Sequence, residues 1–277
     1  MEIQNHLSLE VFEEIYPFNE VTGRALFKVR DRKTQLFYAL KTFALELNDE
    51  KEIQREILSL NNYDFGSVVP KCRWFSVAGD HGMLLMDWVE GRNVAQRYSS
   101  PPEDFYAMRE RIAHLQGLCI ALDKLHARKI FHRDLKPENI IISLDRGAEE
   151  KIKLIDFGMV NVRRGQRLCE GSSFRAPEQD GRRDFNLMAQ VDIFSVGKIG
   201  WWLLTGTNPQ LFENEETFAD WDNLDSLSLS DGCPIAPKSL ELALKGALAY
   251  QPEKRYRSAK QFEFALKNCK LKEGKIA

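Results

Sequence analysis

The order of apolar and polar residues predicts a strand-rich first part of the chain. Apolar runs at residues 25–29 and 36–40 flank the polar segment 30–34, and this pattern predicts a β-hairpin. Residues 49–60 change to the three- and four-residue spacing of a helix, whereas residues 68–89 return to strands. This part of the chain is therefore predicted to form a small sheet with one main helix.

From about residue 103 onwards the apolar spacing becomes mainly helical. Apolar residues recur every three or four positions from Ile112 to Leu125, which marks a long buried helix. Two short apolar runs, 140–142 and 152–155, are predicted to be buried strands. The whole pattern predicts an α+β fold with a β-rich first lobe and a helical second lobe. Further helices are predicted at residues 188–205, 238–249 and 258–268.

Composition and charge limit the kinds of partner. The 277 residues are 43% apolar with a formal net charge of −2, which suits a globular chain with a full core. We expect no nucleic acid partner, because duplex binding usually needs a strong basic excess. No apolar run approaches the roughly 20 residues of a membrane helix, so we expect no membrane insertion. Five scattered cysteines without metal-ligand spacing suggest reduced thiols and a cytoplasmic protein.

The segment His132–Asn139, with the sequence HRDLKPEN, carries the strongest chemical signal. Asp134 can accept a hydroxyl proton, Lys136 can neutralise a transferring phosphoryl group, and Asn139 can hold a magnesium ion. The segment resembles the catalytic loop of eukaryotic-type protein kinases, and Lys136 is typical of their serine/threonine branch. The resemblance implies a two-lobed kinase fold that transfers the γ-phosphoryl group of Mg-ATP to a protein hydroxyl.

Two further motifs resemble the parts of a kinase that hold the phosphates. Tyr38–Lys41 resembles the family's V-A-I-K strand, so Lys41 would bind the first two phosphates and Glu56 would orient it by an ion pair. Asp156 and Phe157 begin a D-F-G motif after an apolar strand. The resemblance implies that Asp156 chelates the magnesium ion, with Mn²⁺ as an alternative, and that Phe157 packs under the helix 49–60.

The segment 86–91 resembles the hinge between the two kinase lobes. By that resemblance, the backbone of Asp87 and Val89 would hydrogen-bond the adenine of ATP. Its ring would stack between Ala39 and Ile141, and Leu26 is counted among the nucleotide-binding residues on the same grounds.

The phosphate-binding loop departs from the family pattern. The G-x-G-x-x-G-x-V motif aligns with Asn19–Leu26, where all three glycine positions carry other residues and Gly23 stands one place early. Glycines let backbone amides approach phosphates closely, so we expect weaker nucleotide binding. This departure supports an alternative function, a pseudokinase that acts as a nucleotide-binding or scaffolding module.

The later motifs concern the protein substrate and the folding of the second lobe. Ala176–Glu178 forms the family's A-P-E motif, and the resemblance gives Glu178 a buried partner in Arg255. Asp192 corresponds to the aspartate that caps the catalytic-loop backbone. The A-P-E segment builds a platform for protein substrates, which argues against a small-molecule kinase on a similar fold.

Control of the enzyme is expected at the segment before Ala176. Ser172 or Ser173 would either bridge Asp134 and Lys136 or carry a phosphate. In the family, an arginine such as Arg133 often binds that phosphate. We therefore expect autophosphorylation or a regulatory protein to control activity.

The resemblance extends over nearly the whole chain. It implies one kinase domain over residues 1–277, and its parts are a first lobe at 9–88, a hinge at 87–91, a second lobe at 92–269 and a tail at 270–277.

Overall fold

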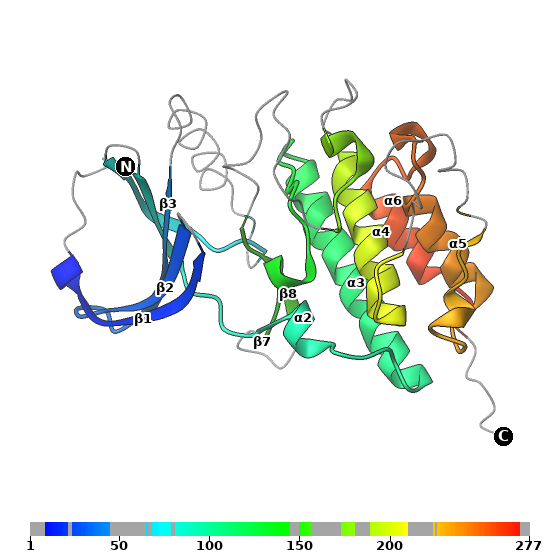
Figure 1. Cartoon of the computed structure of the whole chain (residues 1–277), viewed down its shortest axis with the longest axis horizontal. Helices are drawn as coiled ribbons and strands as arrows, with labels where there is room; N and C mark the ends of the chain where they lie inside the picture. The colour runs from blue at the N-terminus through cyan, green and yellow to red at the C-terminus, as the bar shows by residue number, and fades with distance from the viewer. Residues whose placement is uncertain are drawn as a thin grey trace. The chain divides into compact units, whose positions relative to one another are not determined.

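The computed structural model divides the chain into two compact units, Met1–Glu90 and Gly91–Ala277 (Figure 1). The boundary falls within the predicted hinge at 87–91, while the extent of a single kinase domain stays a prediction. The structure describes residues 9–21, 24–44, 65, 68–78, 81–144, 150–156, 173–180, 189–209, 224 and 226–271.

The first unit is built on a five-stranded antiparallel sheet in the order β1-β2-β3-β5-β4 (Figure 1). A short 3₁₀ turn at Leu9–Val11 precedes it. Phe12, Val29, Leu40 and Leu85 are buried together and form a core of this unit. The strands are β1 (Phe12–Val21), β2 (Arg24–Asp31), β3 (Phe37–Ala44), β4 (Cys72–Ala78) and β5 (His81–Asp87).

The predicted hairpin is confirmed as β2 and β3, which pair from Arg30 opposite Phe37. Its turn forms because the Asp31 carboxylate accepts hydrogen bonds from the backbone N–H groups of Lys33 and Thr34, at 3.0 and 2.6 Å. The polar segment between the two apolar runs therefore forms its turn through hydrogen bonds within the segment.

The second unit combines a small sheet with a set of helices. The sheet has the order β6-β7-β8, with β6 at Arg92–Asn93, β7 at Ile140–Leu144 and β8 at Glu150–Leu154. The helices are α2 (Val94–Arg97), α3 (Phe105–His126), α4 (Ala189–Thr205), α5 (Lys238–Ala247) and α6 (Ala259–Lys267). Short 3₁₀ helices lie at Pro137–Asn139, Pro177–Asp180, Leu229–Asp231 and Pro252–Lys254.

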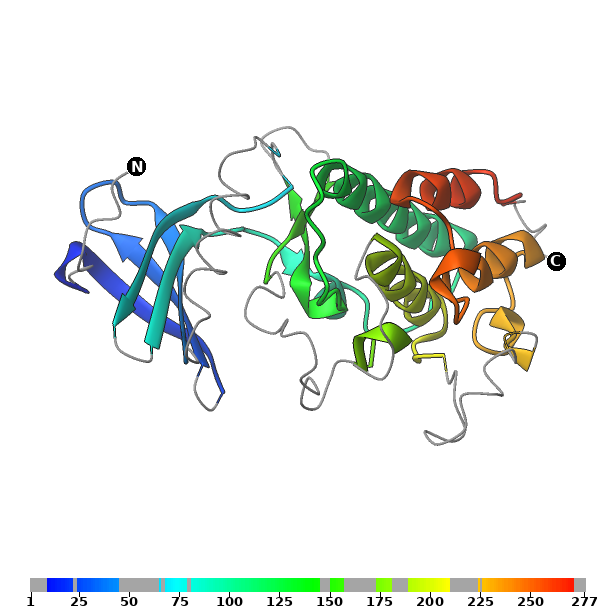
Figure 2. The same cartoon turned by 90° about the horizontal axis from the view of Figure 1, so that it is seen from above.

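Helix α3 lies against both α4 and α6 (Figure 2). It begins at the N-cap Asp104, whose carboxylate accepts from the Ala107 N–H at 2.7 Å. Helix α4 is almost entirely buried, and Asp192 and Lys198 are charged residues within its buried part. A buried charged side chain needs a hydrogen-bond or ion-pair partner. We therefore expect Asp192 and Lys198 to bind groups of segments that pack against α4.

The α+β fold class is confirmed, as are the helices at 105–126, 189–205, 238–247 and 259–267. The predicted helix at 49–60 lies outside the described residues. Helix α2 was not predicted, because four residues are too few to show a period. It is fixed instead by a capping box, in which Asn93 and Gln96 bond reciprocally at 2.8 and 3.2 Å. Of the helices in the described residues, none has the length and apolarity to cross a membrane.

Candidate active site

The catalytic-loop segment places Asp134, Lys136 and Asn139 close together. Asn139 is buried, and its Nδ2 donates to the backbone carbonyl of Asp134 at 2.8 Å and to Asp134 Oδ2 at 3.3 Å. Lys136 Nζ lies 3.9 Å from Asp134 Oδ2. The Asp134 side chain keeps 17% of its surface exposed, so the carboxylate can meet a hydroxyl from solvent or substrate. A partly exposed carboxylate and a cation therefore lie next to each other on this loop.

Asp192 of α4 fixes the backbone of the catalytic-loop segment by hydrogen bonds. Its Oδ2 accepts from the His132 N–H at 2.9 Å and from His126 Nε2 at 2.8 Å, while its Oδ1 accepts from the Arg133 N–H at 2.8 Å. Burial opposes ionisation, but the hydrogen bond and charge of His126 outweigh it and hold the pKa of Asp192 below its usual value. Arg133 has a positive φ of 65°, and these contacts stabilise that strained conformation.

His132 connects the loop to the end of β8. Its ring is buried, and Nε2 donates to the Ile155 carbonyl at 2.9 Å, while the Ile155 N–H donates to the Asn139 carbonyl at 3.0 Å. Burial lowers the pKa of His132, which favours the neutral ring with its proton on Nε2. Asp156 follows at once, with a positive φ of 55°. These backbone bonds bring the segments that carry Asn139 and Asp156 side by side.

The chemistry of these two side chains fits a magnesium ion. Asn139 uses Nδ2 in both bonds to Asp134, so Oδ1 is the atom that can serve as a ligand. Asp156 supplies carboxylate oxygens. Amide and carboxylate oxygens are hard ligands, which Mg²⁺ prefers over nitrogen or sulfur.

Glu178 and Arg255 form a buried, bidentate ion pair. Arg255 Nη1 and Nη2 lie 2.7 and 2.8 Å from the two Glu178 oxygens, and the side chains of Arg255 and Glu178 are 0% and 1% exposed. The remaining guanidinium hydrogens go to the carbonyls of Gln190, Ala249 and Tyr250. The arginine therefore joins the A-P-E segment to the start of α4 and to the chain after α5, as the resemblance implies.

Ser173 is not brought to the catalytic loop. Its Oγ accepts from Asn208 Nδ2 at 2.7 Å, and its carbonyl accepts from Lys198 Nζ at 2.5 Å. A bridge from Ser173 to Asp134 and Lys136 is therefore not formed. Ser172, the other residue predicted for this bridge, lies outside the described residues, as do Glu56 and Phe157.

The predicted nucleotide residues of the first unit lie on neighbouring strands. Lys41 is half-buried on β3, with Leu26 of β2 opposite it on one side. Ala39, two residues earlier, is opposite Met86 of β5. Because strand residues alternate between faces, Ala39 and Lys41 point to the same face of the sheet.

The hinge residues are partly engaged within the first unit. The Asp87 N–H donates to the Lys71 carbonyl at 2.9 Å, and the Asp87 carboxylate forms an ion pair with Arg73 at 2.5 Å. Since a residue has one backbone N–H, this group of Asp87 cannot also donate to adenine. Val89 is buried. Ile141, the predicted stacking residue of the second unit, is half-buried on β7.

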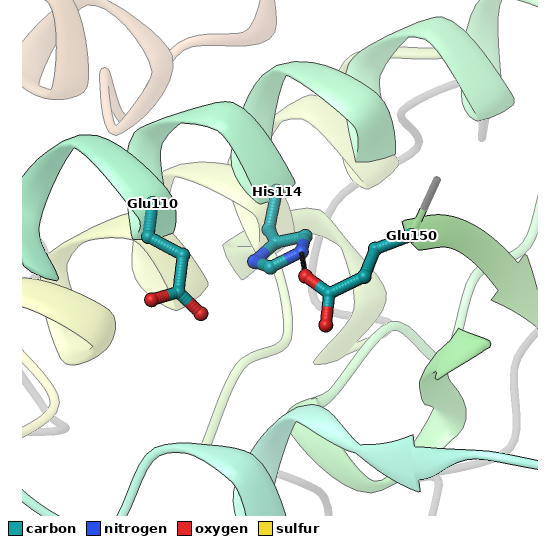
Figure 3. A group of neighbouring side chains, drawn as sticks. All are labelled: Glu110, His114 and Glu150. Carbon is teal, nitrogen blue, oxygen red and sulfur yellow. Dashed lines mark hydrogen bonds and ion pairs between the residues drawn. The ribbon is translucent and has the colours of Figure 1, made fainter. Parts of the chain in front are cut away.

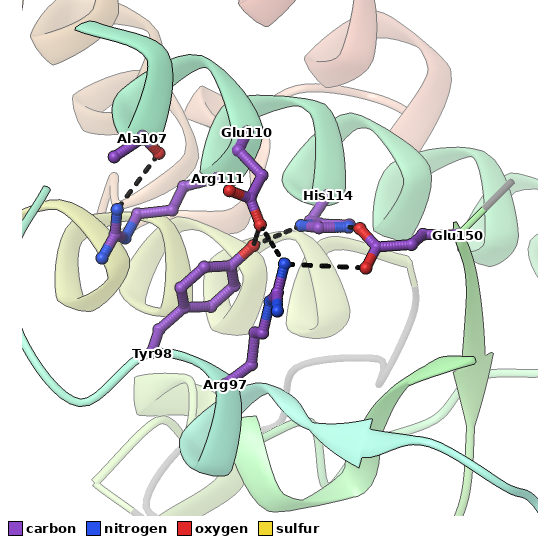
Figure 4. A network of polar contacts seen from close by, with 7 residues as sticks. All are labelled: Arg97, Tyr98, Ala107, Glu110, Arg111, His114 and Glu150. Atoms are coloured by element: carbon purple, nitrogen blue, oxygen red, sulfur yellow. Dashed lines mark hydrogen bonds and ion pairs between the residues drawn. The ribbon is translucent and has the colours of Figure 1, made fainter. Parts of the chain in front are cut away.

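A second polar cluster in the same unit has metal-ligand chemistry. Nitrogen and carboxylate ligand atoms of Glu110, His114 and Glu150 lie within 4.8 Å of one another (Figure 3). However, Arg97 Nη2 lies 2.8 Å from Glu110 and 3.7 Å from Glu150 (Figure 4). A guanidinium between the carboxylates already neutralises them and would repel a metal ion. We interpret the cluster as an ion-pair network that joins α2, α3 and β8.

Hydrogen bonds continue this network through the buried ring of His114. Its Nε2 lies 2.9 Å from Glu150 Oε2, and its Nδ1 lies 2.5 Å from the Tyr98 hydroxyl oxygen, which is also 3.0 Å from Glu110 Oε1 (Figure 4). The single hydroxyl hydrogen of Tyr98 can be donated to only one of these two acceptors at a time. A carboxylate only accepts, so a neutral His114 carries its proton on Nε2. Burial lowers the pKa of His114, and the Glu150 carboxylate opposes this without reversing it.

Three polar residues near the site were not singled out from the sequence. Lys198 and Asn208 hold Ser173, and Gln179 donates to the Arg133 carbonyl. The sequence does contain a signal for Lys198, because a charged residue within an apolar helix needs a buried partner. Nothing in the spacing of Asn208 or Gln179 indicates their partners.

Comparison with known proteins identifies the family. The family model described as the protein kinase domain matches residues 22–263. The chain therefore belongs to the protein kinase family.

The relatives that match include a protein named as a serine/threonine kinase. It is 27% identical to the Aurora kinase of Saccharomyces cerevisiae, over 97% of this chain and 73% of that protein. It is 30% identical to the serine/threonine-protein kinase Pkn1 of Myxococcus xanthus, over 66% of this chain and 27% of that protein. The chain thus spans from about a quarter to three quarters of these relatives' lengths.

Solved structures support the fold. The PknI kinase domain of Mycobacterium tuberculosis matches with a TM-score of 0.68 and 20% identity, over 92% of this chain and 96% of that one. A single mutant of the same domain matches with a TM-score of 0.70 and 20% identity, over 96% of this chain and 98% of that one.

The buried ion pair gives a stability prediction. We expect Arg255→Met to lower the free energy of unfolding by about 3–5 kcal/mol, because Glu178 is left as an unpaired buried charge. The exposed pair Arg73–Asp87 provides the control, and Arg73→Met should cost less than about 1 kcal/mol. Urea denaturation measures both. Equal losses for the two variants would contradict a buried structural role for Arg255.

The cluster around His114 predicts a pH dependence. A histidine titrates near pH 6.5 when unfolded, and burial lowers the pKa in the fold, so the unfolded chain binds more protons as the pH falls. The stability is full above about pH 6.5 and declines as the pH falls towards the folded pKa. Between about pH 7 and pH 5, we expect the free energy of unfolding to fall more steeply for the native chain than for His114→Gln.

Identical slopes for the native chain and His114→Gln would show that His114 does not carry the effect.

Proposed function

We propose that this chain transfers the γ-phosphoryl group of ATP to a serine or threonine hydroxyl of a protein. The observation that supports this most is the arrangement of Asp134, Lys136 and Asn139 on a loop fixed by Asp192. The loop combines a partly exposed carboxylate with a nearby cation. Positioning and charge neutralisation supply most of the rate in such a transfer.

Each residue of the loop has a distinct part in the proposed reaction. Asp134 accepts the proton of the attacking hydroxyl, and Asn139 orients that carboxylate through its bond to Oδ2, at 3.3 Å. Lys136, 3.9 Å from the same oxygen, offsets the negative charge of the transferring group. Asn139 and Asp156 would hold Mg²⁺, which when bound neutralises charge on the phosphates.

The nucleotide contacts are proposed by resemblance to the family. Lys41, oriented by Glu56, would bind the first two phosphates, by resemblance to the family. Adenine would contact Leu26, Ala39 and Ile141. Because the Asp87 N–H is already engaged, its carbonyl and the backbone of Val89 are the proposed hinge contacts.

Regulation is proposed at Arg133. Its Nε is buried and, within the described part of the chain, has no hydrogen-bond partner. A phosphate on Ser172, or on Ser173 once its hydroxyl is released from Asn208, would supply one through a charge-assisted contact. Protein substrates and a cytoplasmic location are part of the same proposal. The names of the relatives give no support to a pseudokinase, and the following experiment separates the two functions.

The experiment measures transfer of label from γ-labelled ATP to a generic basic acceptor protein in the presence of Mg²⁺. We expect Asp134→Asn to lower kcat by about 10²–10⁴-fold, since the base is lost. The variant should keep the rise in melting temperature that Mg-ATP causes.

The exposed Asp231 provides a matched control, and Asp231→Asn should transfer at the native rate. A native chain that gains thermal stability from Mg-ATP but transfers no label would support the pseudokinase. If it shows neither effect, nucleotide binding itself is refuted.

A further inference from the structure

Gln179 occupies a position between the A-P-E segment and the catalytic loop. It directly follows Glu178 on the short helix Pro177–Asp180 and is only 7% exposed. Its Nε2 donates to the Arg133 carbonyl at 2.7 Å, and its Oε1 accepts from the Ala176 N–H at 3.0 Å. Both ends of the amide are therefore used, one on each segment.

The carbonyl that Gln179 holds belongs to the peptide bond entering Asp134. Arg133 is a non-glycine residue with a φ of 65°, a conformation that costs free energy unless its surroundings fix it. Asp192 Oδ1 accepts from its N–H at 2.8 Å, and Gln179 donates to its carbonyl at 2.7 Å. The residue before the proposed base is thus held at both backbone polar groups, from two different elements.

The segment that carries Gln179 is itself anchored at its other end. Lys198 of α4 donates to the Ser173 carbonyl at 2.5 Å, and Asn208 donates to the Ser173 hydroxyl at 2.7 Å. The Arg255–Glu178 pair fixes the residue next to Gln179. A displacement of the segment 173–180 would therefore shift the Arg133 carbonyl through its hydrogen bond to Gln179.

We propose that Gln179 is a positioning residue that transmits the placement of the segment 173–180 to the base Asp134. This inference rests on the proposed phosphotransfer. It adds to that function a direct link between the substrate-binding platform and the base. When the segment is in place, the amide fixes the peptide plane before Asp134 and with it the direction of the carboxylate.

Only a side-chain amide can make both contacts. A carboxylate of the same size can still accept from the Ala176 N–H, but it cannot donate to the Arg133 carbonyl. Methionine has a similar length and makes neither bond. Gln179→Glu therefore breaks the contact to the loop alone, and Gln179→Met breaks both.

The test compares these two variants with Gln116→Met, a matched substitution of a half-buried glutamine on α3. With a protein acceptor, we expect kcat to fall about 10- to 100-fold for both Gln179 variants, because the base is misplaced. The Michaelis constant for ATP and the thermal shift with Mg-ATP should stay at native values. Gln116→Met should behave as the native chain.

Hydrogen exchange provides a readout that does not depend on activity. We expect peptides covering residues 130–136 to exchange faster in both Gln179 variants, with no change in peptides from α6. If a native chain transfers label and the Gln179 variants match it in kcat and in exchange, the link is refuted while the proposed function stands. If the native chain transfers nothing, the proposed function fails, and unchanged exchange at 130–136 would then refute the link separately.

Discussion

The catalytic loop depends on one buried carboxylate. Asp192 has no exposed surface, and it satisfies the backbone N–H groups of His132 and Arg133 as well as the ring of His126. Because α4 is almost entirely buried, this carboxylate ties the loop to the core of its unit. The hydrogen bonds also hold Arg133 in its positive-φ conformation, and that conformation sets the direction in which the chain enters Asp134.

Hydrogen bonds and an ion pair connect the other residues of the site to the catalytic loop that Asp192 fixes. His132 bonds the Ile155 carbonyl and so fixes the position from which Asp156 projects. Gln179 holds the opposite side of Arg133, and Glu178 beside it is paired with Arg255. The segments that carry Asp134 and Asp156 are therefore placed by backbone groups whose partners are buried side chains.

Much of this arrangement could be predicted from the sequence, and the remainder could not for physical reasons. Apolar periodicity predicted α3, because its buried residues recur every three or four positions. The β2–β3 hairpin was predicted because two apolar runs flank a polar segment, and α4 because its apolar run is long. The roles suggested for Asp192 and Arg255 came from motif order, and the structure brings both to the expected partners. The contacts of Gln179 and Ser173 depend on distant backbone groups, and periodicity carries no information about them.

The phosphate loop is where the chain departs from its family. Strands β1 and β2 pair as far as Val21 and Arg24, so the residues aligned with the first glycines are strand residues other than glycine. A residue other than glycine at these positions hinders the close approach of backbone amides to phosphate. We expect this departure to weaken nucleotide binding, whereas the catalytic loop in the other unit carries the residues proposed for phosphotransfer.

The most direct test of the account is the rate of phosphotransfer by Asp192→Asn, measured well below its melting temperature. An asparagine cannot accept from all three donors, because its amide nitrogen is itself a donor and leaves a buried group unsatisfied. If Asp192 holds the base in place, kcat should fall by at least about tenfold while the thermal shift with Mg-ATP remains. A folded Asp192→Asn variant that transfers label at the native rate would contradict the account.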